Sequence, residues 1–198
     1  MPPGVPNLFM RTIIPKNAKL IPENSERVFK GEIFDVYQWQ QKMFDGTHET
    51  FEMLKRPDTV KIIAVKDDKI VICEEQQPNT NVFLDIPSGR HDVETESELD
   101  AAKRELLEET GMTFANWRLI SAEQSHTKID WFVYTFLATG FIDQTEQKLD
   151  SGEKITVHLK SFEETIKLAN DSRNRYIPIE ILEQAGSIDG LQNLPQYL

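Results

Sequence analysis

Three glutamates between Arg104 and Glu109 constrain this chain more than any other feature. Glu105, Glu108 and Glu109 stand at i, i+3 and i+4, so in a helix their carboxylates share one face. At an effective dielectric constant of 20, two unit charges about 4 Å apart repel by roughly 4 kcal/mol. A fold that gathers three carboxylates is therefore expected to supply a cation. Mg²⁺ fits best, because it takes oxygen ligands and leaves coordination sites open to water and phosphate.

The flanking residues predict where this helix begins and ends. Thr95 followed by Glu98 predicts a capping box, and Gly111 stands where a left-handed residue ends a helix. The helix is therefore expected over residues 97–110. Residues 86–89, with the sequence IPSG, predict a strand that leaves the core and turns tightly towards the helix.

A longer pattern surrounds the three glutamates. Its fixed positions are Glu96, Arg104, Glu105, Leu106, Glu108, Glu109, Gly111 and Met112. This pattern resembles the Nudix box, G-x5-E-x7-R-E-U-x-E-E-x-G-U, the signature of Nudix hydrolases. Gly89 is separated from Glu96 by six residues rather than five, which implies one extra residue in the loop. A solvated acidic helix face is the alternative, but it explains neither the register of Arg104 with Glu96 nor a glycine at both ends.

The resemblance implies a role for each residue of the pattern. Glu105 and Glu109 resemble the principal metal ligands of the family and Glu108 a secondary one. The backbone carbonyl of Ser88, just before Gly89, resembles the ligand that completes the site. Arg104 is expected to position carboxylates and Glu96 to brace the loop. The implied cofactor is Mg²⁺, with Mn²⁺ as an alternative.

Two residues are candidates for the general base that accepts a proton from water. In the ADP-ribose pyrophosphatase branch of the family, the base comes from a glutamate in the loop after the last long strand. Glu153, at the end of the polar loop 141–152, resembles it in order and context. The alternatives are that Glu153 merely begins a strand and that Glu108 is the base.

The segment 27–58 is expected to form an antiparallel sheet before the catalytic domain. Its residues alternate in polarity, and Asp45-Gly46 predicts a hairpin turn. It resembles the strand-rich element of Nudix enzymes that act on nucleoside diphosphate sugars, an element often exchanged between the subunits of a homodimer. Tyr37 and Trp39 are candidates to stack on a nucleobase, although core packing is the alternative. Arg56 is the third candidate for substrate binding.

The rest of the chain predicts an α/β (α+β) architecture, with a mixed sheet sandwiched between helices, which matches the Nudix fold. Four parts are expected: an extended arm (1–26), the N-terminal sheet (27–58), the catalytic domain (59–190) and a tail (191–198). The further expected strands are 60–65, 70–75, 82–86, 117–122, 129–139 and 153–160, with helices at 162–170 and from about 178 to 186.

The composition of the chain limits the kinds of partner that it is expected to bind. The net charge of −11 argues against a nucleic-acid surface, because such binding depends on Lys and Arg neutralising phosphates. No run is long and apolar enough to cross a membrane, and the first residues do not resemble a signal peptide, so a cytoplasmic protein is expected. The single cysteine, Cys73, is expected to be buried in a strand.

The expected function is Mg²⁺-dependent cleavage of the pyrophosphate bond in nucleoside diphosphate sugars, such as ADP-ribose and GDP- or ADP-sugars. The resemblance implies a nucleoside monophosphate and a sugar phosphate as products. Members selective for ADP-ribose have a proline about fifteen residues beyond the box, whereas here no proline lies between Met112 and Pro178, so a broader range is expected. The alternatives are a nucleoside triphosphate pyrophosphatase and a non-catalytic sensor of nucleotide sugars.

Overall fold

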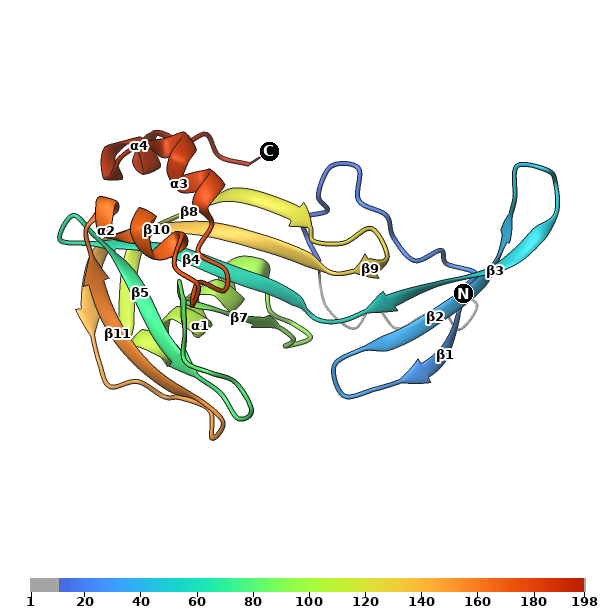
Figure 1. Ribbon diagram of the computed structural model, residues 1–198, viewed down its shortest axis with the longest axis horizontal. Helices are drawn as coiled ribbons and strands as arrows, with labels where there is room; N and C mark the ends of the chain where they lie inside the picture. Colours follow the sequence, from blue (N-terminus) through green and yellow to red (C-terminus); the bar gives the residue numbers. More distant parts are fainter. Residues whose placement is uncertain (1–10, 198) are drawn as a thin grey trace.

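The computed structural model describes residues 11–197 (Figure 1). The strands in this part of the chain are β1 (Glu26–Lys30), β2 (Asp35–Lys42), β3 (His48–Lys55), β4 (Asp58–Lys66), β5 (Lys69–Gln76), β6 (Phe83–Asp85), β7 (Ser88–His91), β8 (Met112–Gln124), β9 (Ile129–Asp130), β10 (Phe132–Gln144) and β11 (Lys154–Lys160). The helices are α1 (Glu98–Thr110), α2 (Phe162–Ala169), α3 (Ile179–Ala185) and α4 (Ile188–Asn193). In the same part, no helix is long and apolar enough to cross a membrane.

A mixed sheet forms the centre of the molecule, with the strand order β11-β5-β4-β10-β8. β4 runs parallel to β10, and its other partners, β5 and β7, are antiparallel to it. Ile62 of β4 belongs to the core cluster that contains Leu106 of α1, while its neighbour Ile63 packs with the cluster that contains Leu182 of α3. β4 is therefore buried on both faces, as its unbroken apolar run predicts.

Helices cover both faces of this sheet. α1 packs on one face through Ala101, Ala102 and Leu106, and α2, α3 and α4 supply residues to the core on the other face. Figure 1 shows α3 and α4 side by side at the top of the molecule. The expected mixed sheet sandwiched between helices is confirmed.

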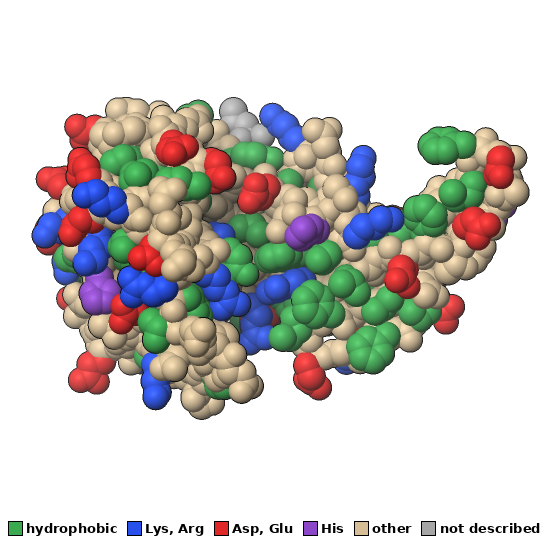
Figure 2. Space-filling view, viewed as in Figure 1, with side chains coloured by type: hydrophobic (Ala, Val, Ile, Leu, Met, Phe, Trp, Pro, Cys, Tyr) green, Lys and Arg blue, Asp and Glu red, His purple; other side chains and the backbone are tan. Residues whose placement is uncertain are grey.

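A second sheet, with the order β1-β2-β3-β9, extends away from the catalytic domain (Figure 1). β2 and β3 are joined at Gly46, whose positive φ of 90° suits the predicted hairpin turn. Hydrophobic side chains gather on this sheet and its hairpin (Figure 2), and Phe29 and Phe44 are exposed. Among the described strands that follow β3 in the chain, only the two-residue strand β9 pairs with this sheet.

Three expectations were wrong at the ends of elements. The loop expected over 141–152 is shorter, because β10 continues to Gln144 and pairs Phe141 with Phe114 of a β8 that already begins at Met112. The tail expected over 191–198 contains the end of α4, whose Leu191 is fully buried. The helix α1 is capped by Ser97 rather than Thr95.

The arm expected over residues 1–26 is described from Arg11 onward, and its first ten residues lie outside the described part. Residues 11–19 lie against the catalytic domain. The backbone N–H of Lys16 donates to the hydroxyl of Tyr197 at 3.1 Å, and that of Lys19 to the side-chain oxygen of Gln124 at 2.7 Å. Ile13 packs against the core beside α1. This segment is therefore part of the domain surface.

Candidate active site

The helix α1 presents the acidic residues in a fixed frame. Ser97 caps its first turn by accepting the backbone N–H of Asp100 at 3.1 Å, and Gly111 ends it with φ of 70°. Glu109 is 5% exposed, while the side chain of Glu108 is 41% exposed. The exposure of the three predicted carboxylates therefore ranges from buried to solvent-accessible.

The backbone of β7 lies directly against the carboxylates of α1. The N–H of Ser88 donates to Glu109 Oε2 at 3.0 Å. A Cβ atom added at Gly89 would lie 2.0 Å from Cδ of Glu105, so only glycine leaves room for that carboxylate. The structure thus brings Ser88, Gly89, Glu105 and Glu109 together, although they come from a strand and a helix separated by a loop.

Arg104 connects the loop before α1 to the acidic face. Its guanidinium donates to Glu96 at 2.9 and 3.0 Å, to Glu105 at 2.8 Å and to Glu108 at 3.1 Å. It also donates to the backbone carbonyl of Arg90 at 2.9 Å. These contacts place Arg104 and Glu96 where the sequence predicts a positioning role.

Burial changes the titration of the acidic residues. It raises the pKa of Glu105 to about 7, an effect that Arg104 partly offsets. Burial also raises the pKa of Glu109 well above its usual value, and the charge of Glu105 adds to the effect. One arginine is therefore insufficient to compensate the negative charge of this face.

A divalent cation fits this donor set. Carboxylate oxygens that are buried, close to one another and short of positive charge are ligands that Mg²⁺ or Mn²⁺ would stabilise. The absence of a side chain at Gly89 lets the carboxylate of Glu105 lie against the backbone of β7. Within residues 11–197, no three acidic, histidine or cysteine side chains are already arranged around one metal position. A divalent ion at this position would therefore require the carboxylate side chains to rearrange.

The loop that carries Glu153 is tied to the C-terminal end of α1. The N–H of Thr145 donates to the carbonyl of Gly111 and that of Lys148 to the carbonyl of Glu108, both at 2.8 Å. The amide of Gln147 donates to the carbonyl of Glu109. These bonds satisfy carbonyls that a helix end leaves without partners. The first half of the loop is thereby held in register with the metal-ligand candidates.

Glu153 lies at the end of this loop and lines the same cavity as Glu105, Glu108 and Glu109. Its side chain accepts a bond from the N–H of Asp150 at 3.3 Å. Burial raises its pKa, and the charges of Asp150 and Glu108 add to this effect. A glutamate with a raised pKa beside a metal-ligand cluster is suited to accept a proton from water.

The cavity of about 1090 Å³ extends from the acidic face to two groups of cationic and aromatic residues. In the first, the guanidinium of Arg56 lies 4.4 Å from the ring centroid of Trp131 and 5.6 Å from that of Phe34. In the second, Arg175 lies 4.6 Å from the ring of Phe83 and 5.2 Å from that of Tyr176. Both groups are suited to hold the planar or anionic parts of a nucleotide.

Within a single chain, the two aromatic residues that were predicted to stack on a nucleobase do not line the cavity. Tyr37 is 2% exposed, and neither it nor Trp39 lines the cavity. Trp39 packs on Phe51 within the N-terminal sheet, at 6.1 Å between centroids. Arg56 does line the cavity, and its role in substrate binding stays a prediction.

The residues that the sequence analysis missed are Trp131, Phe34, Arg175 and Tyr176. The sequence holds a weak signal for one pair, because Arg175 and Tyr176 belong to the short basic stretch RNRY. Trp131 follows an aspartate in a strand predicted to be buried, and nothing in that pattern points to a ligand.

Three comparisons with known proteins agree with this arrangement. The family model described as NUDIX domain matches residues 55–178. An ADP-ribose pyrophosphatase from Bacillus subtilis (strain 168) is 30% identical over 155 residues, covering 76% of this chain and 83% of that protein. The solved structure described as an ADP compounds hydrolase superposes with a TM-score of 0.67 at 18% identity, over 81% of this chain and 90% of the other, which shows a shared fold.

Proposed function

The chain belongs to the Nudix family, and we propose that it hydrolyses the pyrophosphate bond of nucleoside diphosphate sugars of the ADP-ribose type, using Mg²⁺ or Mn²⁺. The observation that carries this proposal is the shared cavity. It combines the buried carboxylates of α1 with the cation–aromatic pair of Arg56 and Trp131. In a nucleoside diphosphate sugar, the pyrophosphate can lie at the carboxylates through a bound metal ion, and the nucleoside can contact Arg56 and Trp131.

The donor set assigns the metal ligands of this proposal. Glu105 and Glu109 are the principal ligands, Glu108 is a secondary ligand, and the carbonyl of Ser88 completes the set. A divalent ion bound there neutralises phosphate oxygens and makes water more acidic. The contacts of Arg104 keep Glu105 and Glu108 on one side of the cavity.

Glu153 is proposed as the general base. It takes a proton from the attacking water as the water oxygen bonds to one phosphorus atom. The bond from that phosphorus to the bridging oxygen breaks, and the bridging oxygen leaves with the other phosphate. One water is consumed, and the products are a nucleoside monophosphate and a sugar phosphate. Glu108 is the alternative base.

The lining of the cavity also bears on substrate range. The ring of Trp131 and the guanidinium of Arg56 offer planar surfaces, which any nucleobase can contact through its π-face. Arg175 and Lys61 also line the cavity and supply cations for phosphate or sugar oxygens. Because a stacking contact does not distinguish one base from another, we propose that several nucleoside diphosphate sugars are accepted.

The N-terminal sheet is proposed to form a homodimer, with residues 27–58 as the dimerisation element. β1 is exposed along its whole length, and the exposed residues Val28, Phe29, Ile33 and Phe44 belong to this element. A small sheet that exposes apolar side chains gains stability when a second copy covers it. If Trp39 stacks on a nucleobase as predicted, it does so at the cavity of the partner in such a dimer, because it does not line the cavity of its own chain.

A panel of nucleoside diphosphate sugars, nucleoside triphosphates and dinucleotides, assayed with Mg²⁺ and with Mn²⁺, tests the proposal. We expect nucleoside monophosphate and sugar phosphate from several nucleoside diphosphate sugars, identified by anion-exchange chromatography. Cleavage of triphosphates alone would assign a nucleoside triphosphate pyrophosphatase instead. Binding of nucleotide sugars without turnover under any metal condition would assign a sensor.

A further inference from the structure

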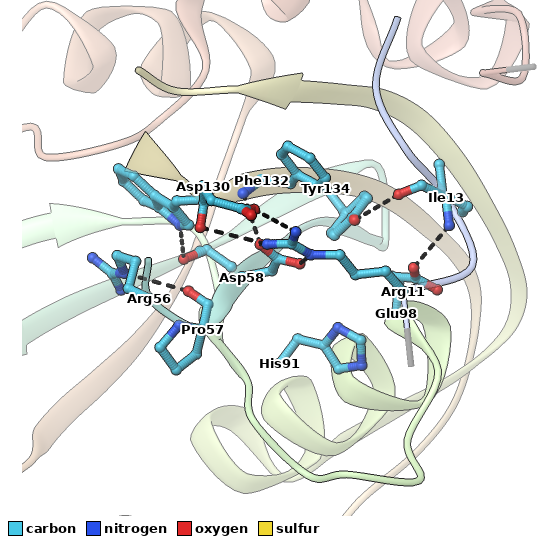
Figure 3. A network of polar contacts seen from close by, with 12 residues as sticks. Arg11, Ile13, Arg56, Pro57, Asp58, His91, Glu98, Asp130, Phe132 and Tyr134 are labelled. Carbon is cyan, nitrogen blue, oxygen red and sulfur yellow. Dashed lines mark hydrogen bonds and ion pairs between the residues drawn. The ribbon is translucent and has the colours of Figure 1, made fainter. Parts of the chain in front are cut away.

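Arg11 lies between two carboxylates in the interior of the domain (Figure 3). Its Nε and Nη2 donate to Asp58 at 2.6 and 2.7 Å, and its Nη1 donates to Asp130. The side chains of Arg11, Asp58 and Asp130 are 12%, 1% and 5% exposed. The guanidinium also lies 4.2 Å from the ring centroid of Phe132. One planar group thus joins the start of β4 to β9.

Each aspartate lies close in the chain to a residue that lines the cavity. Asp58 follows Arg56 by two residues, and Asp130 immediately precedes Trp131. Arg56 and Trp131 are the stacked pair that lines the cavity. Asp58 also accepts the backbone N–H of Phe132 at 2.8 Å, and the indole of Trp131 donates to Thr59 at 3.0 Å. The bridge that Arg11 makes between Asp58 and Asp130 therefore adds a side-chain link to the backbone contacts that hold Arg56 beside Trp131.

The residues after Arg11 contact the metal-ligand helix. The carboxylate of Glu98, in the first turn of α1, accepts bonds from the N–H groups of Thr12 and Ile13 at 2.7 and 3.0 Å and from the hydroxyl of Thr12. The hydroxyl of Tyr134 donates to the carbonyl of Ile13 at 2.7 Å. Residues 11–13 consequently link the cation–aromatic pair to the helix that carries Glu105 and Glu109 (Figure 3).

We propose that Arg11 is a positioning residue for nucleoside binding: it fixes Asp58 and Asp130 and thereby holds Arg56 and Trp131 at stacking distance. This inference rests on the proposed function, because it takes the cavity as the nucleotide site. Lysine cannot replace arginine in this role, since an ammonium lacks the planar fork that serves two carboxylates at once.

Two ligands that differ only in the nucleoside separate this role from general stability. ADP and inorganic pyrophosphate both carry a diphosphate, but only ADP can use the pair of Arg56 and Trp131. With Mg²⁺ present, Arg11→Lys is expected to weaken ADP binding by about tenfold, within the range of one lost base-stacking contact, and to leave pyrophosphate binding unchanged. Isothermal titration calorimetry measures both.

The matched control is Arg118→Lys, which replaces a second partly buried guanidinium by an ammonium. Arg118 donates to the carbonyls of Leu191 and Gln192 and does not line the cavity. Its replacement should change neither affinity. Equal weakening of ADP and pyrophosphate in Arg11→Lys, or no weakening of either, would overturn the inference. Failure of the unaltered protein to bind ADP would instead overturn the proposed function.

A double-mutant cycle gives the second readout. If Arg11 acts through the stacked pair, then in a Trp131→Ala background the further change Arg11→Lys should leave ADP affinity almost unchanged. Additive losses would contradict the proposal. Should Arg11→Lys fail to fold, Asp130→Asn weakens the same link while keeping an oxygen acceptor, and the same selective loss of ADP binding is expected.

Discussion

At the scale of single residues, the assignment of the general base depends on position rather than on residue type. Glu108 and Glu153 both line the cavity, but Glu108 is held by Arg104 at 3.1 Å, whereas Glu153 accepts only the N–H of Asp150 in the described structure. A base must give up its existing contacts to reach water, which is easier for Glu153.

Glu153→Gln is therefore expected to lower kcat by roughly 10²- to 10⁴-fold, the usual range for loss of a general base, with little change in KM. Steady-state kinetics with ADP-ribose measure both constants. Glu108→Gln is the comparison, and it should raise the Mg²⁺ concentration needed for half-maximal activity. If Glu108→Gln abolishes turnover while Glu153→Gln is nearly silent, the roles are reversed.

Asp85 makes the stability of the protein depend on pH. Burial raises its pKa to about 7, an effect that Lys61 partly offsets. A carboxyl with a raised folded-state pKa stabilises the fold below its unfolded pKa, and this contribution is lost as the pH rises through about 7. Between pH 6 and pH 8 the loss amounts to about 1.4 kcal/mol for one group.

Chemical denaturation in the presence of a chelator checks this contribution. The free energy of unfolding should fall more steeply from pH 6 to pH 8 in the unaltered protein than in Asp85→Asn, which cannot ionise. The asparagine retains the oxygen that accepts the N–H of Ile86. Identical pH profiles for the two proteins would show that Asp85 does not titrate in this range.

At the scale of elements, hydrogen bonds hold the first half of the loop after β10 to α1. We therefore expect the second half, which carries Glu153, to be the part that moves when substrate binds. Gln147→Ala removes the amide that donates to Glu109 and Ile155. Because misplacement of a catalytic group by about 1 Å can cost up to about 10²-fold, kcat should fall while ADP affinity stays unchanged. Single-turnover kinetics and calorimetry measure the two effects.

Asn193→Ala serves as the control for that prediction. Its amide donates to a carbonyl of α4, the carbonyl of Asp189, and it does not line the cavity. A loss of kcat in this variant equal to that in Gln147→Ala would point to general loosening of the fold rather than to placement of Glu153.

The elements were predictable wherever local signals agreed. The hairpin turn at Asp45-Gly46, the strand expected over 60–65 and the helices expected over 162–170 and from about 178 to 186 are all present in the structure. The prediction failed where a tertiary contact decided. Thr95 does not cap α1, because its expected partner Glu98 is buried against Thr12 and Ile13. No local pattern contains that contact.

The site was predictable along the helix and unpredictable across the cavity. The spacing of Glu105, Glu108 and Glu109 needs only helical periodicity, and Gly89 follows from the motif. The contact between Arg56 and Trp131 joins residues 75 positions apart through Asp58, Asp130 and Arg11. Such a link depends on the pairing of strands, which a single sequence does not specify.

At the scale of the whole molecule, the N-terminal sheet predicts self-association. Phe29 and Phe44 are exposed on this sheet and its hairpin, so the double change Phe29→Ser with Phe44→Ser should convert a dimer into a monomer at micromolar concentration. Light scattering coupled to size-exclusion chromatography gives the mass. Ile142→Ser, which replaces an exposed apolar residue of β10, should leave the dimer intact. A monomeric unaltered protein would refute the dimer.

The central claim is that the carboxylates of α1 bind a divalent ion and thereby cleave a pyrophosphate. The most direct test is the turnover of ADP-ribose by the unaltered protein and by Glu109→Gln over a Mg²⁺ titration. Several kcal/mol of lost charge stabilisation correspond to about a 10³-fold fall in kcat for Glu109→Gln. The thermal midpoint without metal should not fall, because glutamine keeps an oxygen that can accept the N–H of Ser88, and Glu94→Gln, at an exposed position, should behave like the unaltered protein. We expect AMP and ribose phosphate only when Mg²⁺ and Glu109 are both present. Full turnover by Glu109→Gln, independent of metal, would contradict it.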